Sequence, residues 1–269
     1  MDAPRPSLPP PLPTRTASLP RVPGVRHALG MIVLYFALQA AIGMLVALLL
    51  GIALGVARHG AGMGDVQAAM ANADVRSALV VIVLLGDAAV TLWLARRFWP
   101  RLWSQAQPPG FGFSVPAAAW CVVAVAVGLA MPWIGGKLTE LIAGNHAVPQ
   151  DVKQLGGDAS VTFRIALTLV VASAGPLVEE LLFRGVLLSA LLGRLRAAWA
   201  VPASAALFAL VHLPDLHWLW YALPNLALLG VALAWLRLRS GSLWPAVIAH
   251  ACNNLLAMLA QFASLHHAG

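Results

Sequence analysis

Long apolar runs that contain almost no charged residues occupy most of this 269-residue sequence. The whole chain is 60% hydrophobic and only 10% charged. Soluble globular proteins carry about 25% charged residues. So few charges cannot cover the water-facing surface of a soluble domain of this length. We therefore predict an all-α polytopic membrane protein with little structure outside the membrane.

Seven of these runs predict about seven transmembrane helices, because a helix that crosses a bilayer needs about 20 mostly apolar residues. Short segments with proline, glycine or charged residues separate the runs and are expected to end the helices. Pro176 and a group of charged residues interrupt the fourth run. The predicted spans are residues 28–57, 78–95, 115–134, 165–192, 197–213, 218–236 and 243–262.

The basic residues predict how the chain is oriented. Cytoplasmic loops of membrane proteins carry an excess of Lys and Arg. If the N-terminus is cytoplasmic, every inner loop is basic and every outer loop is mixed or acidic. Residues 1–26, rich in proline and arginine, are expected to form a disordered cytoplasmic arm near anionic lipid. The Arg- and Ala-rich composition suggests a bacterial source, so we expect a multi-pass protein of the bacterial inner membrane with a cytoplasmic N-terminus. The net charge of +7 is explained by this topology, and no nucleic-acid partner is expected.

Ionisable side chains inside membrane spans are costly and point to a function. In the fourth run, Glu180 and Arg184 are four residues apart, so they share a helix face and can form an ion pair. Glu179 lies about 100° around the same helix. The spacing therefore predicts that Glu180 and Arg184 form a structural pair, and that the carboxylate of Glu179 remains available for a function.

Two later runs bring histidines to a comparable depth. Phe208 lies one helical turn before His212, and His250 shares a helix face with Asn254. Counted at 1.5 Å per residue from the inner basic flanks, these polar groups and Glu179 lie about 16–24 Å into their spans. A common depth favours one functional site. Asp87, in the second run, has no predicted partner, and both packing and function remain open for it.

Three ordered patterns in these runs resemble a known family. EELLFR at 179–184 fits EExxxR, FALVH at 208–212 fits FxxxH, and HACNN at 250–254 fits HxxxN. Together they are similar to the CPBP family of CAAX proteases and bacteriocin-processing enzymes, also called the ABI family, which is related to the type II CAAX prenyl endopeptidases. The resemblance covers roughly residues 160–265. It divides the chain into the arm at 1–26, N-terminal helices and loops at 27–160, and a catalytic core of the last four helices at 161–265.

The resemblance implies an intramembrane glutamic endopeptidase that acts on a peptide or a membrane protein. It implies that Glu179 activates water with help from His212, and that His250 and Asn254 stabilise the oxyanion. Glu180, Arg184 and Phe208 would support the site, as the spacing argument also indicates for the first two. No cofactor is expected under this mechanism.

Two alternatives stay open. Glu179, His212 and His250 could instead bind a catalytic zinc ion, which needs three protein ligands and a water, and the chain would then be a metalloendopeptidase. The other alternative is a non-catalytic membrane protein of the same fold that acts in bacteriocin immunity or as a scaffold. The complete set of motifs favours the enzyme, because a scaffold does not need a spare buried carboxylate.

Overall fold

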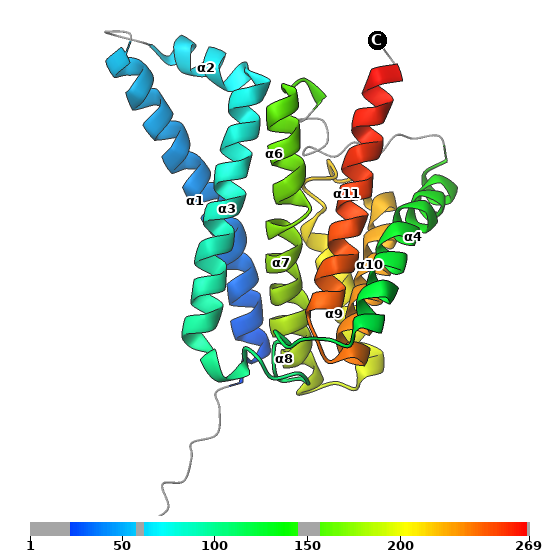
Figure 1. Cartoon of the computed structure of the whole chain (residues 1–269). Helices are drawn as coiled ribbons and strands as arrows, with labels where there is room; N and C mark the ends of the chain where they lie inside the picture. Colours follow the sequence, from blue (N-terminus) through cyan, green and yellow to red (C-terminus); the bar gives the residue numbers. More distant parts are fainter. Residues whose placement is uncertain (1–21, 58–61, 145–156, 268–269) are drawn as a thin grey trace, which may run out of the picture.

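The computed structural model describes residues 22–57, 62–144 and 157–267, and within these ranges the chain is helical and contains no β-strand (Figure 1). The predicted all-α membrane fold is confirmed. The expected N-terminal arm falls outside the described residues as far as residue 21. The elements are α1 (Val25–Ala57), α2 (Met63–Ala71), α3 (Ala73–Phe98), η1 (Pro100–Leu102), α4 (Ala118–Ala143), α6 (Val161–Val171), α7 (Ala174–Glu180), η2 (Leu181–Leu187), α8 (Leu188–Leu192), α9 (Ala197–Val211), η3 (Trp220–Ala222), α10 (Leu223–Ser240) and α11 (Trp244–His267).

Six helical segments of the described chain are long and apolar enough to cross a membrane. They correspond to six of the seven predicted spans. The seventh, expected at residues 197–213, is the 15-residue helix α9. At 1.5 Å per residue α9 is about 22 Å long, which is shorter than the roughly 30 Å hydrocarbon core of a bilayer. The six qualifying segments are Val25–Ala57, Ala73–Phe98, Ala118–Ala143, Val161–Leu192, Trp220–Ser240 and Trp244–Ala263.

The fourth span is not one regular helix. It bends between α6 and α7, at Ala172 and Ser173, and continues after Glu180 as the π-helix η2. Pro176 does not break a helix, as its sequence position suggested; it lies in the first turn of α7, where a missing N–H costs little. Single-turn π-helices occur most often at functional sites. Here the π-helix begins directly after the two acidic residues.

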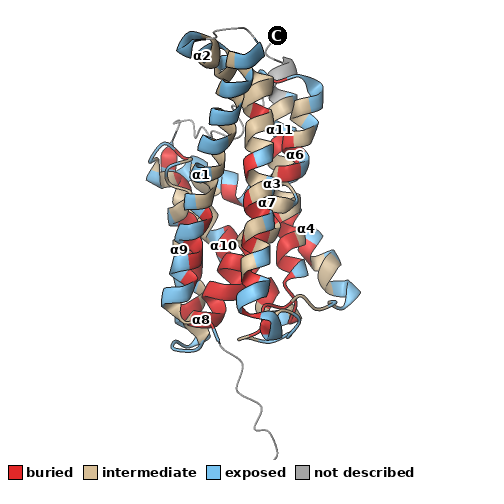
Figure 2. Cartoon of the chain, turned by 90° about the vertical axis from the view of Figure 1, so that its left-hand side faces the viewer, coloured by how far each residue is buried: buried red, intermediate tan, exposed pale blue. Residues whose placement is uncertain are grey.

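Helices α1 and α3 pack beside the fourth span, and α4, α9, α10 and α11 lie on its other side (Figure 1). The buried residues of helix α1, which are Ala28, Met31, Ile32 and Tyr35, all lie in its first third. Its upper part leans away from the bundle in Figure 1. Figure 2 shows that the buried residues gather in the half of the bundle that contains α8. The division into residues 27–160 and 161–265 stays a prediction, and side chains from both ranges share one hydrophobic core.

Helices α4 and α11 cross closely because Gly128 has no side chain. A Cβ atom at this position would lie 2.3 Å from the backbone oxygen of Ala249 and 2.7 Å from the Cβ of Cys252. A Cβ atom at Gly136, two turns later on α4, would have no neighbouring atom within 4 Å. The crossing therefore tolerates only glycine, whereas the later position has room.

We expect Gly128→Ala to destabilise the protein by about 1–3 kcal/mol, because overpacking forces the two helices apart. Thermal unfolding in detergent measures this loss. Gly136→Ala is the matched control and should melt at the wild-type temperature. Equal melting temperatures for the two variants would contradict the close crossing.

Candidate active site

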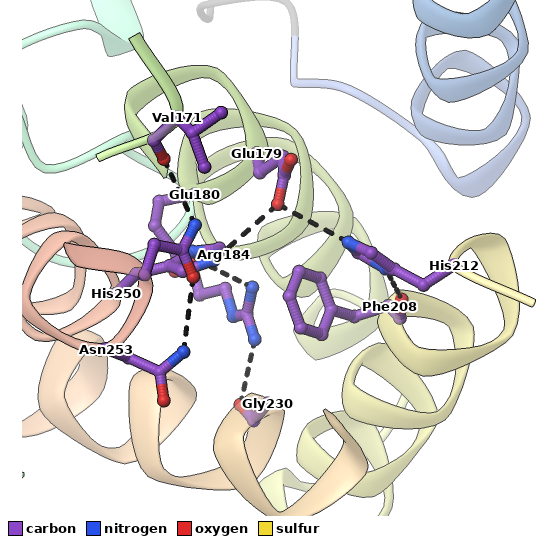
Figure 3. A network of polar contacts seen from close by, with 10 residues as sticks. Val171, Glu179, Glu180, Arg184, Phe208, His212, Gly230, His250 and Asn253 are labelled. Atoms are coloured by element: carbon purple, nitrogen blue, oxygen red, sulfur yellow. Dashed lines mark hydrogen bonds and ion pairs between the residues drawn. The ribbon is translucent and has the colours of Figure 1, made fainter. Parts of the chain in front are cut away.

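The motif residues come together around a cavity of about 510 Å³ in the middle of the bundle. Glu179 reaches it from the end of α7, and His212 from the residue that follows α9 (Figure 3). His250 and Asn254 reach it from α11. Glu180 and Arg184 do not line the cavity; they lie behind it and are fully buried. The structure thus brings together all four residues for which catalytic roles were predicted.

The predicted Glu180–Arg184 ion pair is present. Arg184 Nη1 lies 2.9 Å from Glu180 Oε1, and neither side chain is exposed. The second guanidinium nitrogen, Nη2, donates to the backbone oxygen of Gly230 on α10 at 3.1 Å. The guanidinium carbon lies 4.4 Å from the centre of the Phe208 ring. A buried charge is tolerated when it is paired and hydrogen-bonded, and these contacts provide the pairing, while Arg184 Nε and Glu180 Oε2 have no hydrogen-bond partner among the described residues.

Glu180 makes a second contact that the sequence did not indicate. Its Oε1 atom also lies 2.9 Å from Nδ1 of His250, so one carboxylate oxygen holds both the arginine and a histidine (Figure 3). The prediction assigned Glu180 to structural support alone. In the structure it also orients a histidine of the candidate site. No helix-face argument could find this contact, because the two residues are 70 positions apart on different helices.

Phe208 packs at the centre of the site. Its ring makes edge-to-face contacts with His212 and His250, with ring centres 4.8 and 5.7 Å apart. It contacts Phe183 in the same way. The aromatic ring is itself fully buried. The predicted supporting position of Phe208 agrees with these contacts, since the ring fixes the planes of both imidazoles.

The hydrogen bonds of the histidines define which ring nitrogen faces the cavity. His212 Nδ1 lies 2.7 Å from the backbone oxygen of Phe208. A carbonyl oxygen only accepts, so this nitrogen carries a proton. His250 Nδ1 likewise faces the carboxylate of Glu180. In the neutral form of each ring, Nε2 is therefore the atom with a free lone pair.

Both Nε2 atoms face the same oxygen of Glu179. The Oε2 atom of Glu179 lies 3.8 Å from Nε2 of His212 and 3.8 Å from Nε2 of His250. This oxygen is buried and has no hydrogen-bond partner among the described residues. A separation of 3.8 Å is too long for a direct hydrogen bond and is suited to a bridging water. Three hydrogen-bond acceptors, Oε2 of Glu179 and Nε2 of the two histidines, thus face the same small space. A hydrogen-bond donor or a cation is needed there to satisfy them.

The side-chain amide of Asn254 makes hydrogen bonds to residues other than Glu179, His212 and His250. Its Nδ2 donates to the backbone oxygen of Val171 at 3.1 Å, and its Oδ1 accepts from Nδ2 of Asn253 at 3.2 Å. Val171 is the last residue of α6, directly before the bend in the fourth span. The contact of Asn254 with the helix bend was not predicted.

The acid in the second predicted span lies apart from these groups. Asp87 is fully buried on α3 and accepts a hydrogen bond from Thr91 at 3.3 Å. It is not among the residues that line the cavity.

Sequence reasoning also missed a wall of the cavity that comes from outside the three motifs. Tyr35 and Gln39 of α1 and Leu84 of α3 belong to that wall.

The candidate zinc ligands are spaced more widely than a zinc ion requires. Among the described residues, no group of three or more His, Cys, Asp or Glu side chains is spaced to hold a metal ion. The two 3.8 Å separations are wider than the distance of about 3.3 Å between ligands of a tetrahedral zinc ion with bonds near 2.0–2.1 Å. The donor types suit zinc, whereas the spacing does not.

Comparison with known proteins gives a family match in the second half of the chain. Residues 161–256 match the family model described as "Type II CAAX prenyl endopeptidase Rce1-like". This match supports the resemblance to the CAAX protease family that the three motifs predicted. The matched range contains all the motif residues. It leaves out α1, α3 and α4, which complete the cavity.

The chain is also similar to a protein of Bacillus subtilis (strain 168) named "Putative membrane peptidase YdiL". The two are 23% identical over 182 residues, which cover 67% of this chain and 70% of that protein. No solved structure matched the chain. Together the family match and this relative support a membrane protease.

Proposed function

We propose that the chain is an intramembrane endopeptidase in which Glu179 activates water for attack on a peptide bond. The observation that carries this proposal is the buried, unpartnered Oε2 atom of Glu179, which faces two imidazole nitrogens across 3.8 Å. A carboxylate in that position can accept a proton from a water that the histidines help to hold. The family match and the membrane-spanning helices are consistent with hydrolysis inside the bilayer.

The reaction follows from the positions of these atoms. A water held between Glu179 and His212 gives a proton to the carboxylate while its oxygen attacks the carbonyl carbon of the substrate. The tetrahedral intermediate carries a negative oxygen. Glu179 then passes the proton to the amide nitrogen as the C–N bond breaks, which yields a carboxylic acid and an amine. Because the carboxylate returns to its first state, Glu179 serves as both base and acid.

His250 is placed to stabilise the oxyanion once its Nε2 carries a proton. Nδ1 already bonds to Glu180, so the protonated ring is a cation that lies against a carboxylate. With both histidines neutral, the charges of Glu179, Glu180 and Arg184 add up to −1. A proton on Nε2 of His250 would bring this sum to zero. The second N–H of Asn254 Nδ2 is the other donor that we assign to the oxyanion.

A zinc-dependent reaction is the second candidate mechanism. The observation that favours it is that both Nδ1 atoms are already engaged, by a backbone oxygen and by a carboxylate. Histidines that bind metals are commonly oriented in this way. Glu179, His212 and His250 would then be the ligands, and the metal would polarise the substrate and lower the pKa of its water. The wide spacing of the three atoms ranks this candidate second.

Hydrolysis before and after chelation separates the two mechanisms and tests the proposal itself. We expect purified protein in liposomes to cleave members of a quenched-fluorescence peptide library, and the rate to survive exhaustive removal of zinc. His250→Ala should lower kcat by about 10²–10³-fold, because one oxyanion donor is lost. Loss of activity on chelation, with recovery on added zinc, would establish the metal mechanism instead. A chain that cleaves no peptide in either state would support the non-catalytic alternative, immunity or a scaffold.

A further inference from the structure

Two neighbouring asparagines of α11 form a short chain of hydrogen bonds that ends at the bend in the fourth span. Asn253 donates to Asn254, and Asn254 donates to the backbone oxygen of Val171, at 3.2 and 3.1 Å. Both asparagines line the cavity. The HxxxN pattern includes only the second one, because Asn253 occupies a variable position of that pattern.

The carbonyl group of Val171 needs such a donor. Val171 ends α6, and the last carbonyl groups of a helix have no partner within the helix. In a membrane an unsatisfied backbone group costs several kcal/mol. The side chain of Asn254 supplies the missing hydrogen bond. It thereby ties α11 to the bend that precedes α7, the helix that carries Glu179.

The two hydrogen bonds also fix which way the Asn254 amide faces. Its oxygen accepts from Asn253, and its nitrogen donates to Val171. A flipped amide would place oxygen against the carbonyl oxygen of Val171 and N–H groups against those of Asn253. Both contacts would be repulsive. In the observed orientation, Nδ2 keeps one N–H that Val171 does not use.

We propose that Asn253 is a positioning residue, which holds the amide of Asn254 so that this remaining N–H faces the oxyanion. The inference rests on the proposed function, in which Asn254 stabilises that oxyanion. The backbone oxygen of Val171 cannot be removed by a side-chain substitution. Asn253 is therefore the member of the chain whose contribution mutagenesis measures directly.

The test is a double-mutant cycle with Asn253→Leu and Asn254→Ala, measured on the best-cleaved peptide of the library. Leucine has the same branched shape and the same number of side-chain heavy atoms as asparagine, and it has no donor. We expect Asn253→Leu alone to lower kcat by about 5–10-fold, the size of one lost hydrogen bond, with KM nearly unchanged. In the Asn254→Ala background the same change should have no further effect on kcat. Asn253→Gln keeps an amide donor and should recover part of the rate.

The outcomes separate this inference from the proposed function. If Asn254→Ala lowers kcat but Asn253→Leu acts equally in both backgrounds, or changes only KM, the positioning role is overturned while the protease remains. If Asn254→Ala leaves kcat unchanged, both the oxyanion assignment and the inference fail. Melting temperatures of the same four proteins provide a readout without activity. Non-additive losses support the hydrogen-bonded chain even if no peptide is cleaved, and additive losses overturn it.

Discussion

Glu179→Gln is expected to lower kcat by at least about 10³-fold while the protein remains folded and inserted. The amide cannot take a proton from water, so both the base and the acid of the proposed reaction are lost. Folding should not suffer, because Oε2 of Glu179 makes no hydrogen bond within the described chain. The new NH2 group would even donate toward the lone pairs of His212 and His250. Activity on the quenched peptide and thermal unfolding in detergent measure the two effects.

Glu180→Gln is the matched control for this experiment, since it makes the same chemical change one residue away. Glu180 bonds to Arg184 and His250, so its variant should melt at a lower temperature and should also lose activity. An identical loss of melting temperature in both variants would contradict the division of roles. Full activity of Glu179→Gln would remove Glu179 from the reaction.

Arg184→Leu is expected to destabilise the protein by about 3–5 kcal/mol, because it leaves the buried carboxylate of Glu180 without its cation. The contacts of the guanidinium with Gly230 and Phe208 are lost as well. The double variant Glu180→Leu/Arg184→Leu should recover much of this stability, since apolar residues of similar size often replace a buried ion pair without loss.

Activity should not return with stability in the double variant. His250 would lack the carboxylate that holds its Nδ1 atom. A double variant that is both stable and fully active would show that Glu180 has no part in orienting His250. Unfolding in detergent and peptide hydrolysis, measured on the wild type, Arg184→Leu and the double variant, distinguish these results.

The site could be predicted from the sequence where its parts lie on one helix or at one depth. The four-residue spacing of Glu180 and Arg184 predicted their ion pair, and the structure confirms it. The depth count placed Glu179, His212 and His250 at comparable levels, and the structure brings them together. These inferences needed only the helical period and the rise per residue.

Contacts between different helices could not be predicted from the helical period and the rise per residue. The bonds from His250 to Glu180 and from Asn254 to Val171 depend on how α11 packs against the fourth span. The third span was expected to end at residue 134, before two glycines, but α4 continues to Ala143. Glycine breaks helices in water and is common in membrane helices, where small residues allow close packing. Gly135 lies in such a contact, with the side chain of Asn225.

The shortness of α9 has a consequence for how a hydrolase in a bilayer obtains water. The helix ends about 22 Å from its start, less than the thickness of the hydrocarbon core. The irregular segment after it therefore lies below the upper ends of α6 and α11 (Figure 1). Non-helical backbone at membrane depth is tolerated where it is enclosed by protein or lines a hydrated space. His212 is the first residue of this segment and Leu216 lies within it, and both side chains line the cavity. In the proposed reaction, this segment is the place where water, the reactant least soluble in lipid, would reach the carboxylate of Glu179.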